Sequence, residues 1–508
     1  MSGTGDGVNL VGYLRTESGV GAAARGYARA LRAAGVPVAL RDVSRLQVNR
    51  AEDRGVAGDT DDLHDVSLVC VDVELHYAFL SHLGEDFFRD RYTVGIWAWE
   101  QTTFPRKWYD RFAYYDEVWV GTSFIADALA PVSPVPVVRV PPALDAEAPG
   151  DREAGRRRLG VGPGEFVFLF VFDFHSHAVR KNPLAAVEAF ARAFAPSEPA
   201  RLVLKCVNEQ ADPAHVELLR RRAVGHNVAI HAGYWPAGEV RDLMAACDAY
   251  VSLHRAEGTG LTVSDAMALG KPVVATGWSG NTDFMTVANS FPVRYELVPL
   301  TGNVGPYQAG ELWAEPSVEH AAELMRRVFE DRELGVERGR AARRTIETEF
   351  SAAAVGRLIR RRLDAIALRL RLGEFRAEVH DRFRSYRQLP ERLRKAVGAA
   401  VPAGATVAVV SKGDSELVDL GERRGWHFPQ DDGGGYAGYY PGDGAAAVAH
   451  LEVVRARGAE FLLLPRTAFW WLDRYPEFRR HLESHYHFAH GDEDCVVYRL
   501  AVTAAGEG

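Results

Sequence analysis

The sequence predicts an α/β protein with two doubly wound parallel-sheet (Rossmann-like) domains that face a cleft, followed by a small C-terminal α/β domain. Apolar runs alternate with helical segments through two successive series. The runs show no strict polar alternation, which is typical of parallel strands buried on both faces. The length of 508 residues suits two to four domains of roughly 100–200 residues each. The expected domains are 1–150, 151–345, a helical basic linker at 346–400, and 401–508.

The first series opens with an apolar strand at 8–14 and a glycine-bearing turn at 15–21. A helix follows at 22–35 and ends at Gly35, a residue type favoured just after a helix. Further strands are expected at 36–43, 66–73, 92–100 and 117–123. The proline-rich stretch 131–150 then predicts an interdomain linker.

The second series begins with a strand at 165–173 and a helix at 182–195 that has Pro183 near its first turn. Further strands are expected at 200–207, 227–233, 248–253 and 271–276. Because open α/β sheets bind ligands outside the carboxyl ends of their strands, the loops after these strands are candidate site segments.

The chain is expected to be helical and basic at 341–397. Thirteen Arg or Lys residues stand against five Asp or Glu between Arg357 and Lys395. This segment is either a solvated connecting helix interrupted at Pro390, or a peripheral contact with an anionic membrane surface. Beyond it, strands are expected at 405–411 and 460–465, and helices at 415–425, 444–458 and 469–486.

Composition excludes several classes of protein. A net charge of −8 argues against wholesale nucleic-acid binding, which needs a basic footprint. No apolar run approaches the roughly 18–20 residues of a membrane-spanning helix, and the N-terminal residues lack signal-peptide features. The cysteines lie singly in apolar runs without disulfide or metal spacing: Cys70, Cys206, Cys247 and Cys495. A cytoplasmic location is expected, with contact at the inner membrane face as an option.

The richest stretch for chemistry is 254–284, which follows a buried strand. Gly258 and Gly260 precede a helical segment there, so backbone N–H groups can approach a phosphate at the start of a helix. Glu257 lies before this turn and Asp265 lies eight residues later, so both carboxylates could face the hydroxyls of one ligand. The alternative is an ordinary connection between a strand and a helix.

Basic side chains near this stretch are candidates for neutralising a diphosphate. Arg180 and Lys181 follow the first strand of the second domain, and Lys205 ends the next strand. Lys271 lies in the same domain. Each of the lysines could instead be a solvated surface residue.

The first domain offers candidates for an acceptor site. Trp97, Trp99 and Glu100 could form a platform on which a sugar stacks, or the tryptophans could be core residues. His76 is either part of that platform or a hydrogen-bonded structural histidine. In the C-terminal domain, an aromatic and glycine-rich loop at 425–443 could bind carbohydrate or serve only packing, together with the segments 412–414 and 469–471.

The block EGTGLTVSDAMALGKPVVAT at 257–276 resembles the most specific motif of retaining GT-B glycosyltransferases, the large fourth family with many bacterial members. The resemblance covers roughly residues 8–370. It implies that Glu257 contacts the donor sugar, that Asp265 binds the ribose, and that a short turn presents amides to the diphosphate and sugar. That turn comprises Gly258, Thr259, Gly260 and Leu261. The family usually has Glu at the second acidic position.

Two further features follow from this resemblance. The segment 17–25 is similar to the family's glycine loop, in which Gly19 and Gly21 would face the donor phosphate. The family's diphosphate clamp is commonly an Arg six residues before a Lys, but position 175 is His here. The clamp is therefore expected at Arg180 or Lys181, with Lys205. Neighbouring residues expected to line the cleft or orient Glu257 are Trp278, Ser279, Gly280, Asn281, His254 and Arg255.

The main hypothesis is a retaining hexosyltransferase that uses a nucleotide-diphosphate sugar and a glycan, lipid-linked or small-molecule acceptor. No cofactor or metal is expected, since no Asp-x-Asp motif ends a strand where a diphosphate would need it, and the acidic run at 59–62 falls in a polar loop. The alternatives are a nucleotide-sugar epimerase or hydrolase on the same fold, and a non-catalytic carbohydrate-binding or scaffold protein.

Overall fold

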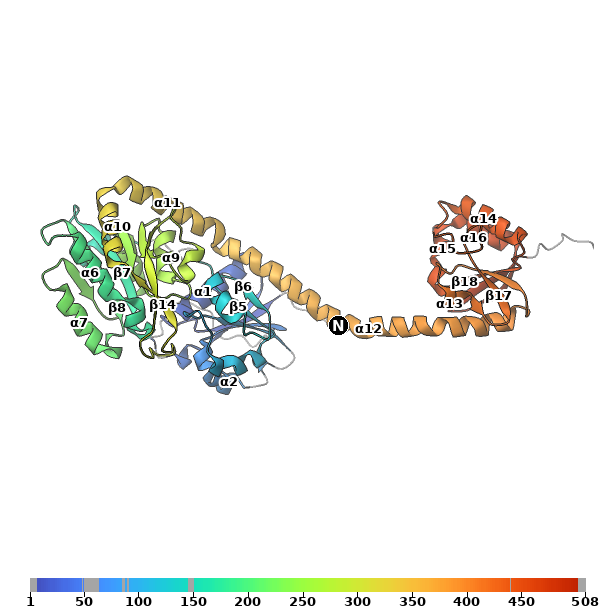
Figure 1. Ribbon diagram of the computed structural model, residues 1–508, viewed down its shortest axis with the longest axis horizontal. Coiled ribbons are helices and arrows are strands. Elements are labelled where there is room, and N and C mark those ends of the chain that lie inside the picture. Colours follow the sequence, from blue (N-terminus) through green and yellow to red (C-terminus); the bar gives the residue numbers. More distant parts are fainter. Residues whose placement is uncertain are drawn as a thin grey trace, which may run out of the picture. The chain divides into compact units, whose positions relative to one another are not determined.

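The computed structural model describes residues 7–47, 49, 64–84, 87–88, 91–144, 150–438 and 440–500, without the side chains of 372–381 and 383. The chain divides into two compact units, Met1–Ala365 and Ile366–Gly508 (Figure 1). The first unit contains two parallel sheets, and the second contains one mixed sheet. The predicted α/β class, with two Rossmann-like sheets and a further C-terminal α/β sheet, is confirmed.

The first sheet is parallel, and its apolar strands are buried as their composition predicts. Across the sheet the order is β2 (Val38–Asp42), β1 (Val8–Gly12), β3 (Val66–Cys70), β4 (Tyr92–Trp97), β5 (Glu117–Val120) and β6 (Val137–Arg139). Its helices are α1 (Gly19–Ala33), α2 (His76–Leu83) and α3 (Ser123–Leu129). Helix α1 begins three residues before the predicted start because the Ser18 side chain caps it by accepting from the Gly21 N–H.

The second sheet is also parallel. Its order is β12 (Phe291–Val293), β11 (Val273–Thr276), β10 (Ala249–Ser252), β7 (Phe166–Asp173), β8 (Ala200–Val207) and β9 (Val228–His231). Its helices are α4 (Arg152–Leu159), α5 (Ala178–Lys181), α6 (Pro183–Ala193), α7 (Pro213–Ala223), α8 (Ala237–Ala246), α9 (Leu261–Ala268), α10 (Val318–Glu330) and α11 (Arg332–Glu349). The strand order reverses between β7 and β10, and in the first sheet between β1 and β3. These are the positions where doubly wound sheets bind ligands.

A hairpin that the sequence analysis did not predict follows the second sheet in sequence and contacts the core of the first sheet. It consists of β13 (Tyr295–Pro299) and β14 (Leu312–Pro316), which pair antiparallel. Tyr307, between these strands, is 4% exposed and packs with Trp99 and the other aromatic residues of the first sheet's core. A segment that follows the second sheet in sequence is therefore part of the first sheet's core.

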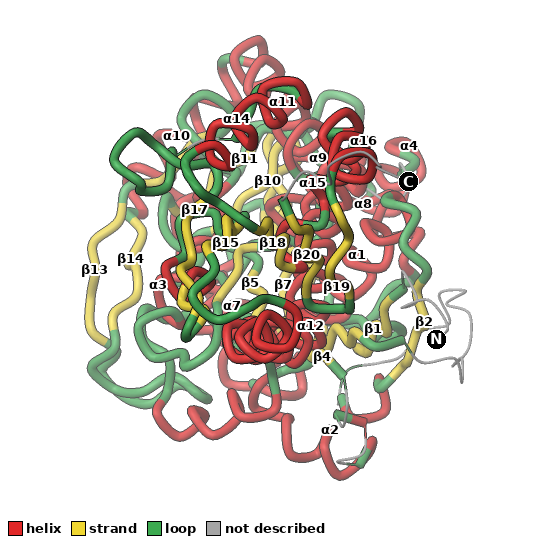
Figure 2. Tube along the Cα trace, turned by 90° about the vertical axis from the view of Figure 1, so that its right-hand side faces the viewer, coloured by secondary structure: helices red, strands yellow, loops and turns green. Residues whose placement is uncertain are grey.

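The second unit has a mixed sheet whose strands Figure 2 shows side by side. The order is β16 (Asp419–Leu420), β17 (Arg423–His427), β15 (Thr406–Val409), β18 (Phe461–Pro465), β20 (Cys495–Arg499) and β19 (His487–Gly491). The helices are α13 (Ser415–Val418), α14 (Gly444–Ala456), α15 (Trp470–Arg474) and α16 (Pro476–His485). Strands β19 and β20 pair antiparallel and were not predicted.

Three local predictions in this region are wrong. The helix expected at 415–425 ends at Val418, because Gly421 turns the chain at φ +67° and Gly425 packs on the Val418 carbonyl. The helix expected at 469–486 is broken before Pro476, which has no N–H to continue it. Pro390 does not interrupt α12 (Ala352–Ala400). The fully buried Leu389 and Leu393 flank this proline, and their packing offsets the lost backbone hydrogen bond.

No described helix combines the length and apolar character that crossing a membrane requires. The basic segment 357–395 lies within α12. Its contact with a membrane surface stays a prediction.

Candidate active-site cleft

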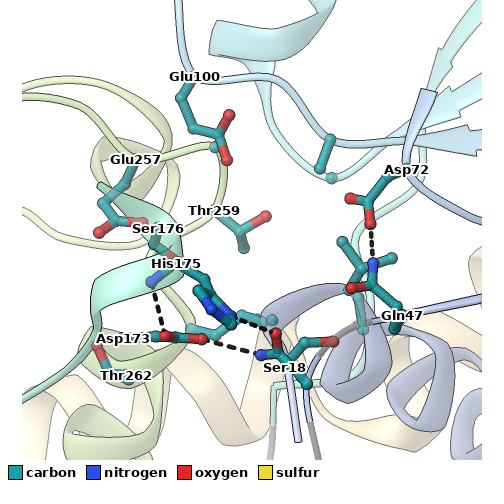
Figure 3. A pocket seen from close by; sticks show the side chains of 18 of the residues that line it. Ser18, Gln47, Asp72, Glu100, Asp173, His175, Ser176, Glu257, Thr259 and Thr262 are labelled. Carbon is teal, nitrogen blue, oxygen red and sulfur yellow. Dashed lines mark hydrogen bonds between the residues drawn. The ribbon is translucent and has the colours of Figure 1, made fainter. Parts of the chain in front are cut away.

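A cavity of about 660 Å³ lies where the carboxyl ends of the two parallel sheets face each other (Figure 3). Residues that follow β1, β3 and β4 line it from the first sheet, and residues that follow β7, β8 and β10 line it from the second. Both points of strand-order reversal therefore open into one space. This is the placement expected for a ligand site in such sheets.

Glycines allow the turn after β10 to pass close to its neighbours. Gly260 has φ +84° and immediately precedes α9. A Cβ on Gly280 would lie 1.9 Å from the Gly258 carbonyl oxygen, and one on Gly258 would lie 3.0 Å from the Trp99 carbonyl oxygen. The turn therefore contacts both the loop after β11 and the first sheet. Gly258, Thr259, Gly260 and Leu261 all line the cavity.

Glu257 is a buried carboxylate held by two cations. It is 8% exposed, with Lys181 Nζ 2.5 Å from Oε1 and Arg180 Nη1 3.5 Å from Oε2. Burial raises the pKa of Glu257, but Lys181 and Arg180 outweigh burial and lower the pKa to about 2. The carboxylate is therefore ionised at neutral pH and can accept hydrogen bonds from hydroxyl groups.

Arg180 and Lys181 are fixed from several sides. Arg180 donates to the carbonyls of Ala256, at 2.7 Å, and Ser176, at 3.2 Å. Burial lowers the pKa of Arg180, but the oxygens of Tyr307, Glu100 and Glu257 raise it above its usual value. Burial lowers the pKa of Lys181 despite the attraction of Glu257. The pair supplies positive charge directly beside Glu257.

Lys205 also lines the cavity, but its partners differ from those of Arg180 and Lys181. It is 2% exposed and donates to the carbonyls of Cys206, at 3.1 Å, and Gly233. Its Nζ lies 5.2 Å from the centre of the Trp235 ring. Burial lowers the pKa of Lys205. Its role in a diphosphate clamp stays a prediction.

A polar network that the sequence analysis missed spans the cavity. Asp173, at the end of β7, accepts from Asn208 Nδ2 at 2.8 Å and from Asn49 Nδ2 at 2.9 Å. Asn49 Oδ1 also lies 2.9 Å from His175 Nδ1. Asn49 follows the first sheet's β2, whereas the other members follow strands of the second sheet. The position of Asp173 at a strand's carboxyl end was the signal that could have found it.

The predicted acceptor residues separate into two groups. Trp97, Trp99 and Glu100 line the cavity, although both tryptophans are 2% exposed and belong to the aromatic core. Trp99 Nε1 donates to the Thr103 carbonyl at 2.7 Å. His76 does not line the cavity: it is fully buried, with Nδ1 3.1 Å from the Tyr115 hydroxyl. Its surroundings are those of a hydrogen-bonded structural histidine.

Two further contacts of acidic side chains lie on the first-sheet wall of the cavity. The Tyr307 hydroxyl donates to Glu100 Oε2 at 3.0 Å. Asp72, which follows β3, lines the cavity and accepts from Gln47. Burial, with the charges of Glu100 and Glu74, raises the pKa of Asp72 to about 7. The sequence analysis did not consider Asp72, although it too follows a strand's carboxyl end.

The remaining predicted donor residues lie at different depths. Gly19 lines the cavity opposite Leu261, whereas Gly21 packs beneath the turn against the Thr16 and Tyr13 carbonyls. Asp265 is exposed on α9 and does not line the cavity, although Thr262, three residues earlier, does. Its contact with a ribose stays a prediction.

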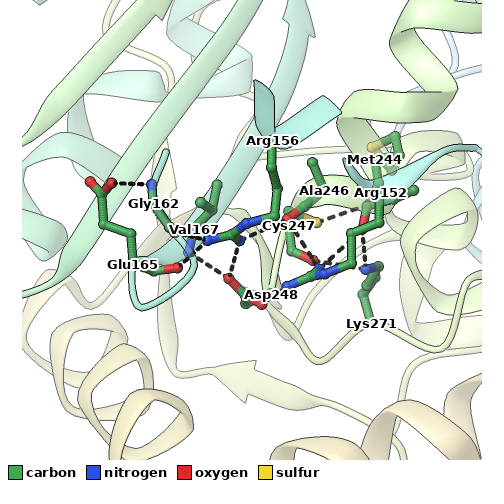
Figure 4. Close-up of polar contacts among 11 residues, drawn as sticks. Arg152, Arg156, Gly162, Glu165, Val167, Met244, Ala246, Cys247, Asp248 and Lys271 are labelled. Carbon is green, nitrogen blue, oxygen red and sulfur yellow. Dashed lines mark hydrogen bonds and ion pairs between the residues drawn. The ribbon is translucent and has the colours of Figure 1, made fainter. Parts of the chain in front are cut away.

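Several other candidate residues do not line the cavity and contact other parts of the protein instead. Lys271 lies away from the cavity and donates to the carbonyls of Ala245, at 2.7 Å, and Cys247, at 2.8 Å (Figure 4). Ser279 accepts from the Glu257 N–H at 2.9 Å, and His254 Nε2 lies 3.0 Å from Asn281 Oδ1. Arg255 pairs with Glu315 of β14. The contacts of Ser279, His254 and Arg255 hold the Glu257 turn in place.

Within the described part of the chain, the only group of three potential metal ligands is His490, Asp492 and Cys495, in the second unit. The acidic run 59–62 lies outside the described residues. The expectation that the site needs no metal stays a prediction.

Comparisons with known proteins agree with this architecture. Residues 165–293 match the family model of glycosyl transferases group 1. The structure of Anabaena Alr3699/HepE in complex with UDP-glucose is similar, with a TM-score of 0.52 and 15% identity over 70% of this chain and 99% of that chain. Sucrose-phosphate synthase from Thermosynechococcus elongatus has the same score and identity, over 72% of this chain and 99% of that chain. No curated protein matches. The chain thus has the GT-B fold, and its residues 165–293 are similar to the glycosyl transferases of group 1.

Proposed function

We propose that this protein transfers a hexose-type sugar from a nucleotide-diphosphate sugar to a hydroxyl acceptor with retention of anomeric configuration. The observation that carries the proposal is the ionised Glu257 between Lys181 and Arg180, on the wall of the cavity between two Rossmann-like sheets. Structures of Anabaena HepE in complex with UDP and glucose, and with UDP-glucose, support the choice of donor class.

The chemistry divides between the two walls of the cavity. On the second-sheet wall, Glu257 accepts hydrogen bonds from the donor's sugar hydroxyls and orients the ring. Arg180, Lys181 and Lys205 stabilise the charge that develops on the leaving nucleoside diphosphate, without a metal ion. On the first-sheet wall, Glu100 and the indole of Trp99 position the acceptor.

Retention is proposed to proceed by front-face displacement. The acceptor hydroxyl attacks the anomeric carbon from the side on which the leaving phosphate departs. The bond from the anomeric carbon to the phosphate oxygen breaks, a bond to the acceptor oxygen forms, and the acceptor's proton passes to the leaving phosphate. An anomeric proton signal of the inverted configuration in the product would refute this mechanism.

The donor assignment is tested by thermal shift with UDP-, GDP-, ADP- and TDP-sugars. Binding to the native state alone stabilises it by about 2.7 kcal/mol at a ligand concentration 100 times Kd. We expect one nucleotide series to raise Tm, and Glu257→Gln and Lys181→Ala to weaken that shift. Arg192→Ala, which alters an exposed pair with Glu319, is the matched control and should keep it. No shift, or equal shifts in all variants, would overturn the proposal.

The same assay tests Asp265. If its carboxylate binds the ribose, Asp265→Ala should raise the Kd of the free nucleoside diphosphate by about tenfold or more, the value of one hydrogen bond to a charged group. Asp265→Glu should retain most of the affinity. An unchanged Kd in Asp265→Ala would remove this residue from the donor site.

A further inference from the structure

The strand order of the second unit creates another reversal point. Strand β15 lies between β17 and β18 and is parallel to both. The chain passes from β15 to β17 on one side and then returns to β18 on the other. The loops after these strands, 410–414, 428–438 and 466–470, therefore meet at the kind of position where open α/β sheets hold ligands.

The loop after β15 is unusual in its backbone. Lys412 has φ +55°, and Gly413 beside it has φ +84°. A lysine in this region of conformational space carries a backbone cost, and such residues concentrate at functional sites. Ser411 anchors the loop: it is 1% exposed, its Oγ lies 2.6 Å from His427 Nδ1, and it accepts from the Gly413 N–H at 3.3 Å. The loop therefore holds the exposed Lys412 in a defined place.

Aromatic rings surround this lysine. Its Nζ lies 5.7 Å from the centre of the Trp470 ring, and Trp470 meets Tyr440 edge to face at 5.2 Å. Tyr436 packs directly over Gly413, where a Cβ would lie 2.9 Å from Tyr Cδ1. Tyr440 is 41% exposed, and Trp470 and Tyr436 are partly exposed. We call Lys412, Tyr436, Tyr440 and Trp470 the aromatic face.

The nearby arginine is engaged elsewhere. Arg466, directly after β18, donates to Ser385 Oγ at 2.6 Å and lies 3.5 Å from Asp494 Oδ1. Those contacts join α12 to the sheet. Lys412, in contrast, is exposed and lies beside the exposed rings. Rigid aromatic surfaces with one well-placed polar group are the usual composition of a small-molecule site.

We propose that the aromatic face is a saccharide-binding site separate from the cleft of the first unit. The apolar C–H faces of a sugar ring pack on Trp470 and Tyr440, because aromatic side chains offer large flat contact areas. Lys412 donates hydrogen bonds to a sugar hydroxyl or, in an acidic saccharide, to a carboxylate. The existence of the site rests on the geometry of the second unit. The choice of a saccharide rests also on the proposed transferase function.

The test is a microarray of neutral and acidic oligosaccharides probed with the full-length chain, followed by titration of the best ligand. We expect Trp470→Ala to weaken binding by about tenfold or more, and Lys412→Ala by several-fold, since each removes one contact. Phe488→Ala is the matched control: Phe488 is 55% exposed but lies on the edge strand β19. It should bind normally.

The variants also separate this proposal from the proposed transferase function. The thermal shift with the nucleotide-sugar should persist in Trp470→Ala and Lys412→Ala, because that ligand binds in the first unit. If Trp470→Ala fails to fold, Tyr440→Ala replaces it. The proposal is overturned if no saccharide binds, if binding survives all aromatic-face substitutions, or if a free nucleotide binds there instead.

Discussion

Glu257 and Asp72 are carboxyl groups on opposite walls of the same cavity, yet their pKa values move in opposite directions. Glu257 lies beside Lys181 and Arg180, and its pKa falls to about 2. Asp72 lies near Glu100 and Glu74, and its pKa rises to about 7. Burial raises the pKa in both cases. The neighbours' charges therefore decide the protonation state of each wall.

Because of this difference in pKa, the charges of the two cavity walls respond differently to pH. The second-sheet wall remains charged across the physiological range, which suits binding an ionic leaving group. The first-sheet wall carries a carboxyl group that exchanges its proton near neutral pH. Two carboxyl groups with separated pKa values mark different chemical roles within one site.

The largest expected effect comes from removing a cation of the second-sheet wall. Arg180→Met leaves Glu257 buried with only Lys181 as an ionic partner. Breaking a buried ion pair costs about 3–5 kcal/mol of unfolding free energy. Chemical denaturation should show this loss, and the thermal shift with nucleotide-sugar should disappear.

Arg139→Met is the control, since Arg139 pairs with Asp283 but its side chain is 50% exposed. Its cost should be about 1 kcal/mol or less. Equal losses of unfolding free energy in the two variants would contradict the interpretation of Arg180 as a partner in a buried ion pair.

A smaller effect is expected from the contact that connects the walls. Tyr307→Phe keeps the ring in the aromatic core but removes the hydrogen bond to Glu100. A hydrogen bond to a charged group contributes about 1.5–3 kcal/mol, and denaturation should show a loss of that order. Tyr77→Phe removes a phenol–carboxylate contact with Asp110 at an exposed site and should change stability little. A stable Tyr307→Phe would mean that its ring alone anchors the hairpin.

The smallest effect, counted per pH unit, concerns the pH dependence of stability. The pKa of Asp72 is about 7 in the folded state and about 3.9 when unfolded, so the folded state binds the extra proton. Its contribution is complete below about pH 4 and is lost as the pH rises through 7, at no more than about 1.4 kcal/mol per pH unit. Unfolding titrations of Asp72→Asn should lack this component.

The control for that titration is Asp65→Asn, which alters an exposed carboxylate just before β3. Its pH profile should follow that of the unchanged protein. Buried histidines contribute in the opposite direction, because burial lowers the pKa of His76 and His254. The informative quantity is therefore the difference between Asp72→Asn and the parent protein. A parent-like slope in Asp72→Asn would show that this group does not titrate as described.

Local sequence signals predicted most of the fold. Apolar runs such as 8–14 and 165–173 are buried parallel strands, because burial on both faces demands apolar residues at successive positions. The predictions failed where a single residue overrides the local pattern. Gly421 converts a helical pattern into a turn, and the packing of Leu389 and Leu393 carries a helix through Pro390.

The candidate site was predictable where its residues are adjacent in sequence. The turn 257–261 and the basic pair Arg180–Lys181 lie together on the cavity wall. Tyr307 was not predictable, because its contact with Glu100 joins residues 207 positions apart. Asp72 likewise owes its raised pKa to burial and to the charge of Glu100, which folding brings close. Residues adjacent in sequence form the turn 257–261, whereas the first-sheet wall of the cavity depends on tertiary packing.

Two of the contacts that join the parallel sheets of the first unit come from segments that follow the second sheet in sequence. The Tyr307 segment is embedded in the first sheet's core, and the start of α12 packs on α1, where Gly356 meets the Ala30 carbonyl. The separation of Glu257 and Glu100 across the cavity is therefore set in part by segments that belong to neither sheet.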